Sequence, residues 1–216
     1  MEYTFSLDIS KDQLNTMAGL IERAVASSLR ALIESEPLLA QDVIENDKVI
    51  NSYEIDIDNS TYNILTVSQV PSEILRTILS IQKINAILER IGDHAVNIAE
   101  SAISLIRQSS DKDLFEIPLM ADLCKKILHD GLISFFENKL DLAKNVLTRD
   151  NEIDSLNISI SNSIKEKVHG AAMSFDIAME LIRICKNLER IADLSTNIAE
   201  ETGFTMIGKS VKHHAE

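Results

Sequence analysis

The sequence has few of the residues that interrupt helices or fill the core of a β-sheet. Its 216 residues include six glycines and three prolines, so long stretches are free to form uninterrupted helices. Aromatic residues make up 4% of the chain and tryptophan is absent, which leaves an aliphatic core. This composition favours helices packed on helices over a β-sandwich.

Positive charge is also scarce, because 21 Lys and Arg stand against 34 Asp and Glu, for a net charge of −13. Proteins that bind nucleic acid neutralise phosphates with clustered Lys and Arg, so the balance argues against a nucleic-acid partner. It equally disfavours unaided binding to an anionic membrane surface. An acidic surface attracts cations, although it also serves simply to keep a protein soluble.

No stretch of the chain approaches the length of a membrane-spanning helix, and the start "MEYTFSLDIS" lacks the features of a signal peptide. The two cysteines, Cys124 and Cys185, form no C-x-x-C pair and suit free thiols in a reducing compartment. We therefore expect a cytoplasmic protein that is peripheral to the membrane only through its partners.

Apolar residues recur at helical spacing almost throughout. In the first half they predict helices over about 14–32, 43–64 and 81–105, with Ser35 as a cap before Pro37 and a break at Pro71. In the second half they predict helices over about 119–140, 142–168 and 175–201, with a break at Gly170. The polar stretch "RQSSDKD" between them predicts a division into two domains, residues 1–108 and 112–216.

One polar phrase occurs twice. "LERIGDHAVNIAE" begins at Leu88, and "LERIADLSTNIAE" begins one hundred residues later at Leu188. Upstream, "NDKVINSYEIDIDNS" parallels "RDNEIDSLNISISNS", which pairs Asp47 with Asp150. A repeat of this kind indicates two copies of one structural unit. We predict an all-α protein built from two tandem three-helix bundles.

The repeated polar residues would form a surface on each long helix. At about 100° per residue, four oxygen-bearing side chains share an arc of about 80° opposite the apolar stripe. In the first half these are Glu89, Asp93, Asn97 and Glu100, and in the second half Glu189, Asp193, Asn197 and Glu200. The preceding helix carries a similar line, made by Asp47, Asn51, Glu54 and Asp58. If the two helices are antiparallel, the rows could run side by side, which the angles alone do not establish.

Glu89 and Asp93 are like charges at i,i+4, a spacing that costs a few tenths of a kcal/mol, and the row has no Lys or Arg. Crowded carboxylates of this kind are what a multivalent cation neutralises. Oxygen ligands suit iron, manganese, magnesium or calcium better than a structural zinc. We therefore predict a metal site, with a merely solvated face as the alternative. His94 points about 100° away from Asp93 and is expected at the surface.

The second half departs from the first at two positions. Asn157 stands where the first half has Glu54. Ser161 likewise takes the place of Asp58. The acids that the second half keeps on this helix are Asp150 and Asp154. The second site is expected to bind metal less tightly or to hold fewer ions.

The doubled "LERI-(G/A)-D----NIAE" resembles the PhoU family of phosphate-transport regulators over essentially the whole chain. "LAQDVIENDKVIN", "LAKNVLTRDNEID" and the C-terminal "GKSVKH" are similar to further family signatures. The resemblance implies two three-helix bundles with pseudo-twofold similarity. It also implies multinuclear clusters of iron or zinc on E/D-x-x-x-D motifs. These motifs correspond to Glu89 with Asp93, Glu189 with Asp193, Glu54 with Asp58 and Asp150 with Asp154.

The resemblance further implies a regulatory protein that restrains phosphate uptake and phosphate-starvation signalling. Its partners would be the ATPase of a phosphate ABC transporter and a phosphate-sensing histidine kinase, and we also expect a homodimer. The sequence contains no phosphate-binding glycine loop, no nucleophile-and-base signature and no dinucleotide fingerprint, so we predict no enzymatic activity. Two alternatives remain: a two-metal phosphohydrolase that uses the acidic faces, and a plain helical scaffold without metal.

Overall fold

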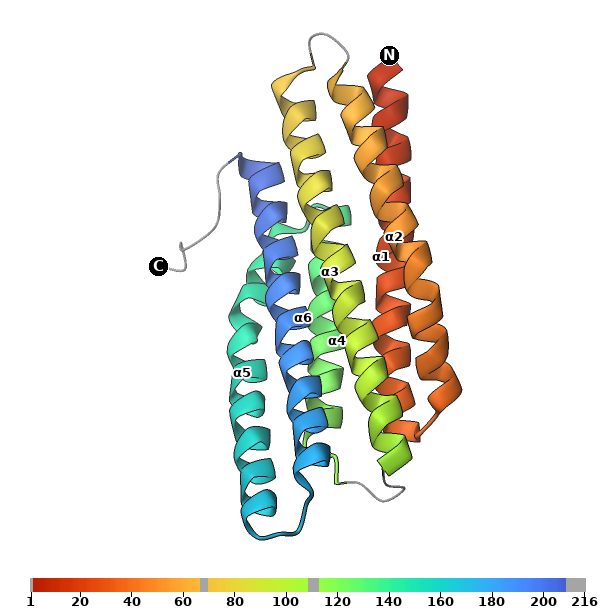
Figure 1. Cartoon of the computed structure of the whole chain (residues 1–216). Helices are drawn as coiled ribbons and strands as arrows, with labels where there is room; N and C mark the ends of the chain where they lie inside the picture. Colours follow the sequence, from red (N-terminus) through yellow and green to blue (C-terminus); the bar gives the residue numbers. More distant parts are fainter. Residues whose placement is uncertain (1, 67–69, 109–112, 209–216) are drawn as a thin grey trace.

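The protein consists of six long helices in the computed structural model, which describes residues 2–66, 70–108 and 113–208 (Figure 1). The side chains of residues 2–5 and of Asp150 lie outside this description. The helices are α1 (Glu2–Glu34), α2 (Pro37–Leu65), α3 (Ser72–Gln108), α4 (Ile117–Phe136), α5 (Leu140–His169) and α6 (Phe175–Ile207). The prediction of an all-α fold is confirmed.

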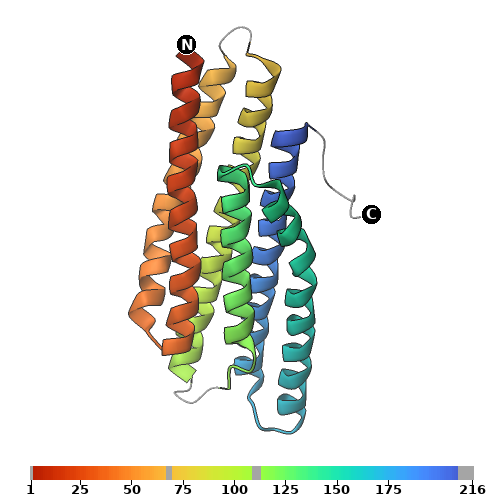
Figure 2. The ribbon, with the colours of Figure 1, turned by 180° about the vertical axis from the view of Figure 1, so that it is seen from behind.

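The helices form two layers (Figures 1 and 2). One layer holds α2, α3, α6 and α5 in that order, and α1 and α4 cover its other side. Helices α1, α2 and α3 pack on one another, as do α4, α5 and α6, so each half of the chain is a three-helix bundle. The predicted pair of tandem bundles is confirmed, while the domain limits 1–108 and 112–216 stay a prediction.

The core explains why these segments are helical. Along α3, large aliphatic residues are buried at spacings of three and four, the period of one helix face. The fully buried aliphatic residues of this face include Ile78, Ile81, Ile84, Leu88, Ile91 and Ile98. Because α6 buries Leu188 and Ile191 at the matching positions, the two long helices present equivalent faces to their bundles.

Several predicted helix ends differ from the structure, because α1 already begins at Glu2 and α3 at Ser72, ahead of the predicted starts near residues 14 and 81. Ser35 does not cap α2: its φ of 60° places it in the left-handed region that commonly follows the last turn of a helix, and Glu36 directly precedes α2. At the other end of the chain, α6 continues past Glu201 to Ile207, and Gly208 ends it with a φ of 74°. Tertiary packing extends α6, because Gly203 is buried inside the helix.

Helices α3 and α6 join the two halves and run antiparallel to each other (Figure 1). At one end Lys83 of α3 pairs with the largely buried Glu201 of α6, at 2.9 Å. Near the middle, Nδ1 of His94 lies 2.8 Å from the amide oxygen of Asn187. His94 is only partly exposed at this junction and contacts α6, so it is not the free surface residue that one helix suggests. The reason is that the second bundle covers a face of α3 that would be exposed to solvent if the first bundle stood alone.

At Gly131, α4 approaches α6 closely. A Cβ at this position would lie 3.0 Å from the backbone carbonyl oxygen of Ser195 in α6. We expect Gly131→Ala to lower the free energy of unfolding by about 1–3 kcal/mol, because the helices must move apart. Gly19→Ala is the control: its Cβ meets only the flexible tip of Arg23, at 3.7 Å, and should stabilise α1 by about 0.5–1 kcal/mol. Urea denaturation measures both, and equal effects would contradict the close contact.

Candidate metal centre

The oxygen rows of α2 and α3 face each other in antiparallel register. Asp47 of α2 lies opposite Asp93 of α3, and Glu54 of α2 lies opposite Glu89 of α3. One turn further on, the amide of Asn85 donates to Oδ1 of Asp58 at 3.0 Å. The angles along a single helix left open whether the two rows face each other, and in the structure they do. Two lines of carboxylates thus meet at the edge of an aliphatic core. We call this contact the seam, and its acids are Asp47, Glu54, Asp58, Glu89 and Asp93.

Burial and repulsion both act on these carboxyl groups. Partial burial raises the pKa of Glu89 above its ordinary value of 4.5, and the charges of Asp93, Glu54 and Asp47 raise it further, against a lowering by Arg90. Burial likewise raises the pKa of Asp47, while a hydrogen bond from Asn51 lowers it and the charge of Asp93 raises it. Ionising these two carboxyl groups therefore costs folded-state stability, first through burial and then through repulsion by their neighbours.

Lys and Arg do not relieve this repulsion by direct pairing. Among the described residues, no ion pair includes an acid of this seam. Several buried polar atoms also lack a hydrogen-bond partner: Oδ1 of Asp47, Oδ1 of Asn51 and Oδ1 of Asn85. Buried oxygens are normally satisfied, so unpaired ones beside repelling carboxylates suit a bound cation.

Asn85 belongs to this seam and was missed in the sequence. It is 1% exposed, and its amide nitrogen donates to the backbone oxygen of Glu54 and to Asp58. A signal was available, because a polar residue among the buried positions of α3 interrupts the aliphatic pattern. The repeat hides it, since the matching position of the second half is Cys185.

Asn97 and Glu100 lie away from the α2–α3 seam. Nη2 of Arg183, from α6, lies 2.7 Å from Oδ1 of Asn97 and 2.7 Å from Oε2 of Glu100. The grouping of these two residues with Glu89 and Asp93 on one seam is therefore wrong. Side chains spread over about 80° of one helix can contact two neighbouring helices, here α2 and α6. Asn97 and Glu100 lie on the side of α3 that faces α6, in the other half of the protein.

The second half repeats the arrangement with different neighbours. Burial raises the pKa of Asp193, Glu189 and Asp154 raise it further, and Arg190 and Lys186 lower it. Glu189 also accepts a hydrogen bond from Asn157, at 2.7 Å. The side chain of Asp150 lies outside the described residues. Asn197 and Glu200 face α3, where they line a hollow of about 540 Å³ with Lys83 and Phe204.

The first-half seam has the chemistry of a metal site but not a ready coordination shell. In the described ranges, no three His, Cys, Asp or Glu side chains are already gathered around one point. A bound ion would have to draw in carboxylates from both helices by side-chain rotation. The residues that fit such an ion are Asp47, Glu54, Asp58, Glu89 and Asp93, since hard oxygen donors suit iron, manganese, magnesium or calcium.

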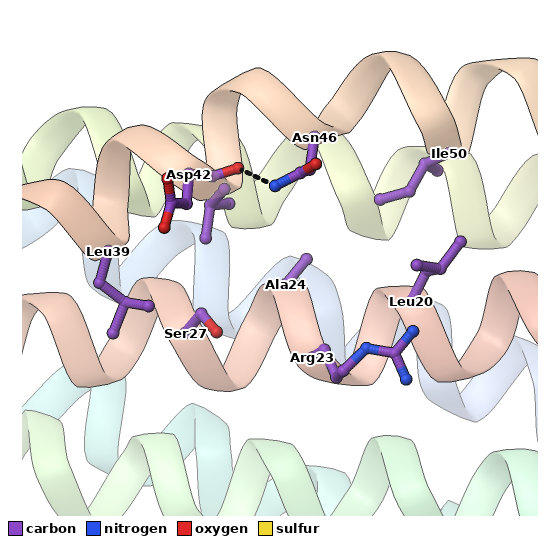
Figure 3. Close-up of a pocket in the computed structure, with 9 residues that line it drawn as sticks. Leu20, Arg23, Ala24, Ser27, Leu39, Asp42, Asn46 and Ile50 are labelled. Carbon is purple, nitrogen blue, oxygen red and sulfur yellow. Dashed lines mark hydrogen bonds between the residues drawn. The ribbon is translucent and has the colours of Figure 1, made fainter.

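A separate groove lies between α1 and α2 (Figure 3). It measures about 290 Å³ and is lined mainly by apolar side chains such as Leu20, Leu39 and Ile50. Asn46 at this groove donates to the backbone oxygen of Asp42 at 2.7 Å, drawn as a dashed line. The residues that line the groove do not include an acid of the seam.

Removing one charge from the seam should stabilise the metal-free protein. We expect Glu89→Gln to raise the free energy of unfolding by about 0.5 kcal/mol at neutral pH, because like charges at this spacing repel. Folding raises the pKa of Glu89, so its charge lowers the free energy of unfolding only when the group is ionised. This destabilisation does not exist below pH 4.5 and grows as the pH rises through the raised pKa. The advantage of the variant should therefore narrow towards acid pH. Urea denaturation in chelator at several pH values measures this, and a variant less stable than the parent would contradict it.

Comparison with known proteins gives relatives that cover almost the whole chain. A protein of Aquifex aeolicus is 33% identical over 207 residues, which span 96% of this chain and 94% of the relative. A protein of Clostridium acetobutylicum is 30% identical over 200 residues, 92% of this chain and 91% of the relative. Both are named phosphate-specific transport system accessory protein PhoU homolog. The names describe accessory proteins of a transport system and name no enzymatic activity.

Solved structures show the same fold. The crystal structure of PhoU from Pseudomonas aeruginosa matches with a TM-score of 0.92 at 30% identity, over 96% of this chain and 100% of the other. The PhoU structure from Streptococcus pneumoniae, at 24% identity, shares the fold with a TM-score of 0.87. The PhoU domain profile matches the chain twice, at residues 14–102 and 117–202. This chain belongs to the PhoU family.

Proposed function

We propose that this chain is a metal-binding regulatory adaptor of a phosphate-specific transport system. It restrains phosphate uptake and phosphate-starvation signalling by acting on the ATPase of a phosphate ABC transporter and on a sensor histidine kinase. Relatives that carry the name of a phosphate transport accessory protein support this role. In the described ranges no helix is long and apolar enough to cross a membrane. We place the protein in the cytoplasm, as a homodimer that reaches the membrane through its partners.

The seam between α2 and α3 is the observation that carries the metal part of the proposal. It combines raised carboxyl pKa values at Asp47 and Glu89 with buried oxygens that lack partners. A cation that binds the folded seam, and not the unfolded chain, stabilises the fold by mass action. Metal would therefore hold α2 against α3 and fix the surface that the partners contact. Iron and zinc are our candidates, with manganese, magnesium and calcium as the others.

The metal proposal predicts a clear change in metal content. Protein stripped with chelator and dialysed against Fe²⁺, Mn²⁺ or Zn²⁺ should retain one of them, and the double variant Glu89→Gln, Asp93→Asn should not. The control is Asp42→Asn, Glu45→Gln, which removes the same charge from an exposed part of α2 away from the seam. Elemental analysis measures the content, and circular dichroism checks that the helices remain. Equal retention in parent and seam variant would exclude the seam as the site.

The regulatory proposal predicts a loss of restraint in cells. Deleting the gene should raise phosphate uptake and switch on the starvation response in phosphate-rich medium. The parent chain should restore repression, and the Asp42→Asn, Glu45→Gln control should do the same. If metal shapes the partner surface, the Glu89→Gln, Asp93→Asn variant should fail to restore it and should bind the transporter ATPase more weakly. Full repression by the seam variant would show that regulation does not need the seam.

A further inference from the structure

The carboxylates of the second half have a cation that the first half lacks. Nζ of Lys186 lies 2.5 Å from Oε1 of Glu189, one turn away on α6. The repeat has an offset of one hundred residues along these helices, so the matching position on α3 is Ala86. An alanine cannot neutralise Glu89, whereas the ammonium group of Lys186 neutralises Glu189 directly.

The α5 side of this seam provides a second partner of Glu189, which is neutral. The amide nitrogen of Asn157 donates to Oε2 of Glu189 at 2.7 Å, so both carboxylate oxygens of Glu189 are occupied. In the first half the same place is taken by Glu54, whose charge adds to the repulsion on Glu89. The exchange of Glu54 for Asn157 thus turns a repelling neighbour into a hydrogen-bond donor.

The buried amide at the inner edge of the seam is also absent from the second half. Asn85 is replaced there by Cys185, which is buried, and burial raises the pKa of its thiol to about 12. A thiol with so high a pKa stays protonated at neutral pH and is a poor metal ligand. Asp193 keeps one contact of its own, with Nη1 of Arg190 at 3.5 Å.

We propose that Lys186 occupies the place of a metal ion in the second half, so that the chain holds metal between α2 and α3 alone. The inference deepens the proposed function and rests on its claim that the first seam binds metal. The charge of Lys186 would repel an incoming divalent ion, and its hydrogen bond would have to be broken first. The two halves then share a fold and differ in what holds their carboxylates together.

The first test separates the two halves by metal content. In parent protein loaded with Fe²⁺, Mn²⁺ or Zn²⁺, we expect Glu189→Gln, Asp193→Asn to leave the bound metal per chain unchanged, while Glu89→Gln, Asp93→Asn removes it. A loss of half the metal or more in the second-half variant would overturn the inference and leave the proposed function standing. Absence of metal from the parent protein itself would overturn both.

The second test moves the lysine. Ala86→Lys places an ammonium group beside Glu89 as Lys186 lies beside Glu189, and it should weaken metal binding at the first seam at least about tenfold. Ala86→Gln is the matched control, because it adds a long polar side chain without charge and should leave the affinity within about twofold of the parent. Isothermal titration with the retained metal measures both. Parent-like affinity in Ala86→Lys protein with intact helicity would show that a lysine here does not exclude metal.

Discussion

Repulsion between carboxylates along the seam of α2 and α3 is the constraint on which the chemistry of this protein depends. Asp47, Glu54, Glu89 and Asp93 face one another at the edge of an aliphatic core, and partial burial weakens the screening that water would provide. The fold can hold them there because its stability comes from elsewhere, from the aliphatic side chains that the helices bury between them. A large apolar core is what permits a surface that is electrostatically unfavourable on its own.

The second bundle shows how the same frame eases that repulsion, although the charges of Glu189 and Asp154 still raise the pKa of Asp193 after burial does. Its equivalent seam keeps Glu189 and Asp193, adds Lys186 and Asn157 as partners of Glu189, and pairs Asp193 with Arg190. A few substitutions on the outer positions of α5 and α6 are enough to do this, because they leave the buried aliphatic positions untouched. Duplicated bundles can therefore diverge in surface chemistry while their packing stays equivalent.

The junction of α3 with α6 lies between the two seams. Arg183 of the second half contacts Asn97 and Glu100 of the first, and His94 contacts Asn187. These contacts lie on the same helix as Glu89 and Asp93, so α3 takes part both in the first seam and in the junction. The layer α2–α3–α6–α5 is thus one continuous row in which both seams and the junction between them lie side by side (Figure 1).

The sequence by itself determined the helical class, the repeat and the acidic row, because all three follow from periodicity. Buried residues recur with the period of a helix, and the phrase from Leu88 returns at Leu188 one hundred residues on. The sequence also predicted that acidic and amide side chains would meet if the second and third helices were antiparallel. The weaker case for the second seam was visible too, at Asn157 and Ser161.

Only the tertiary structure decided which neighbour each part of the helix surface faces. Angles on one helix place Glu100 beside Asp93, but they say nothing of Arg183 on a helix that is distant in the chain. The partly buried position of His94 and the contacts of Asn85 with α2 likewise depend on packing between helices. Periodicity is a property of one helix, whereas a site is formed where two helices meet, and that is fixed by the three-dimensional arrangement of the bundles.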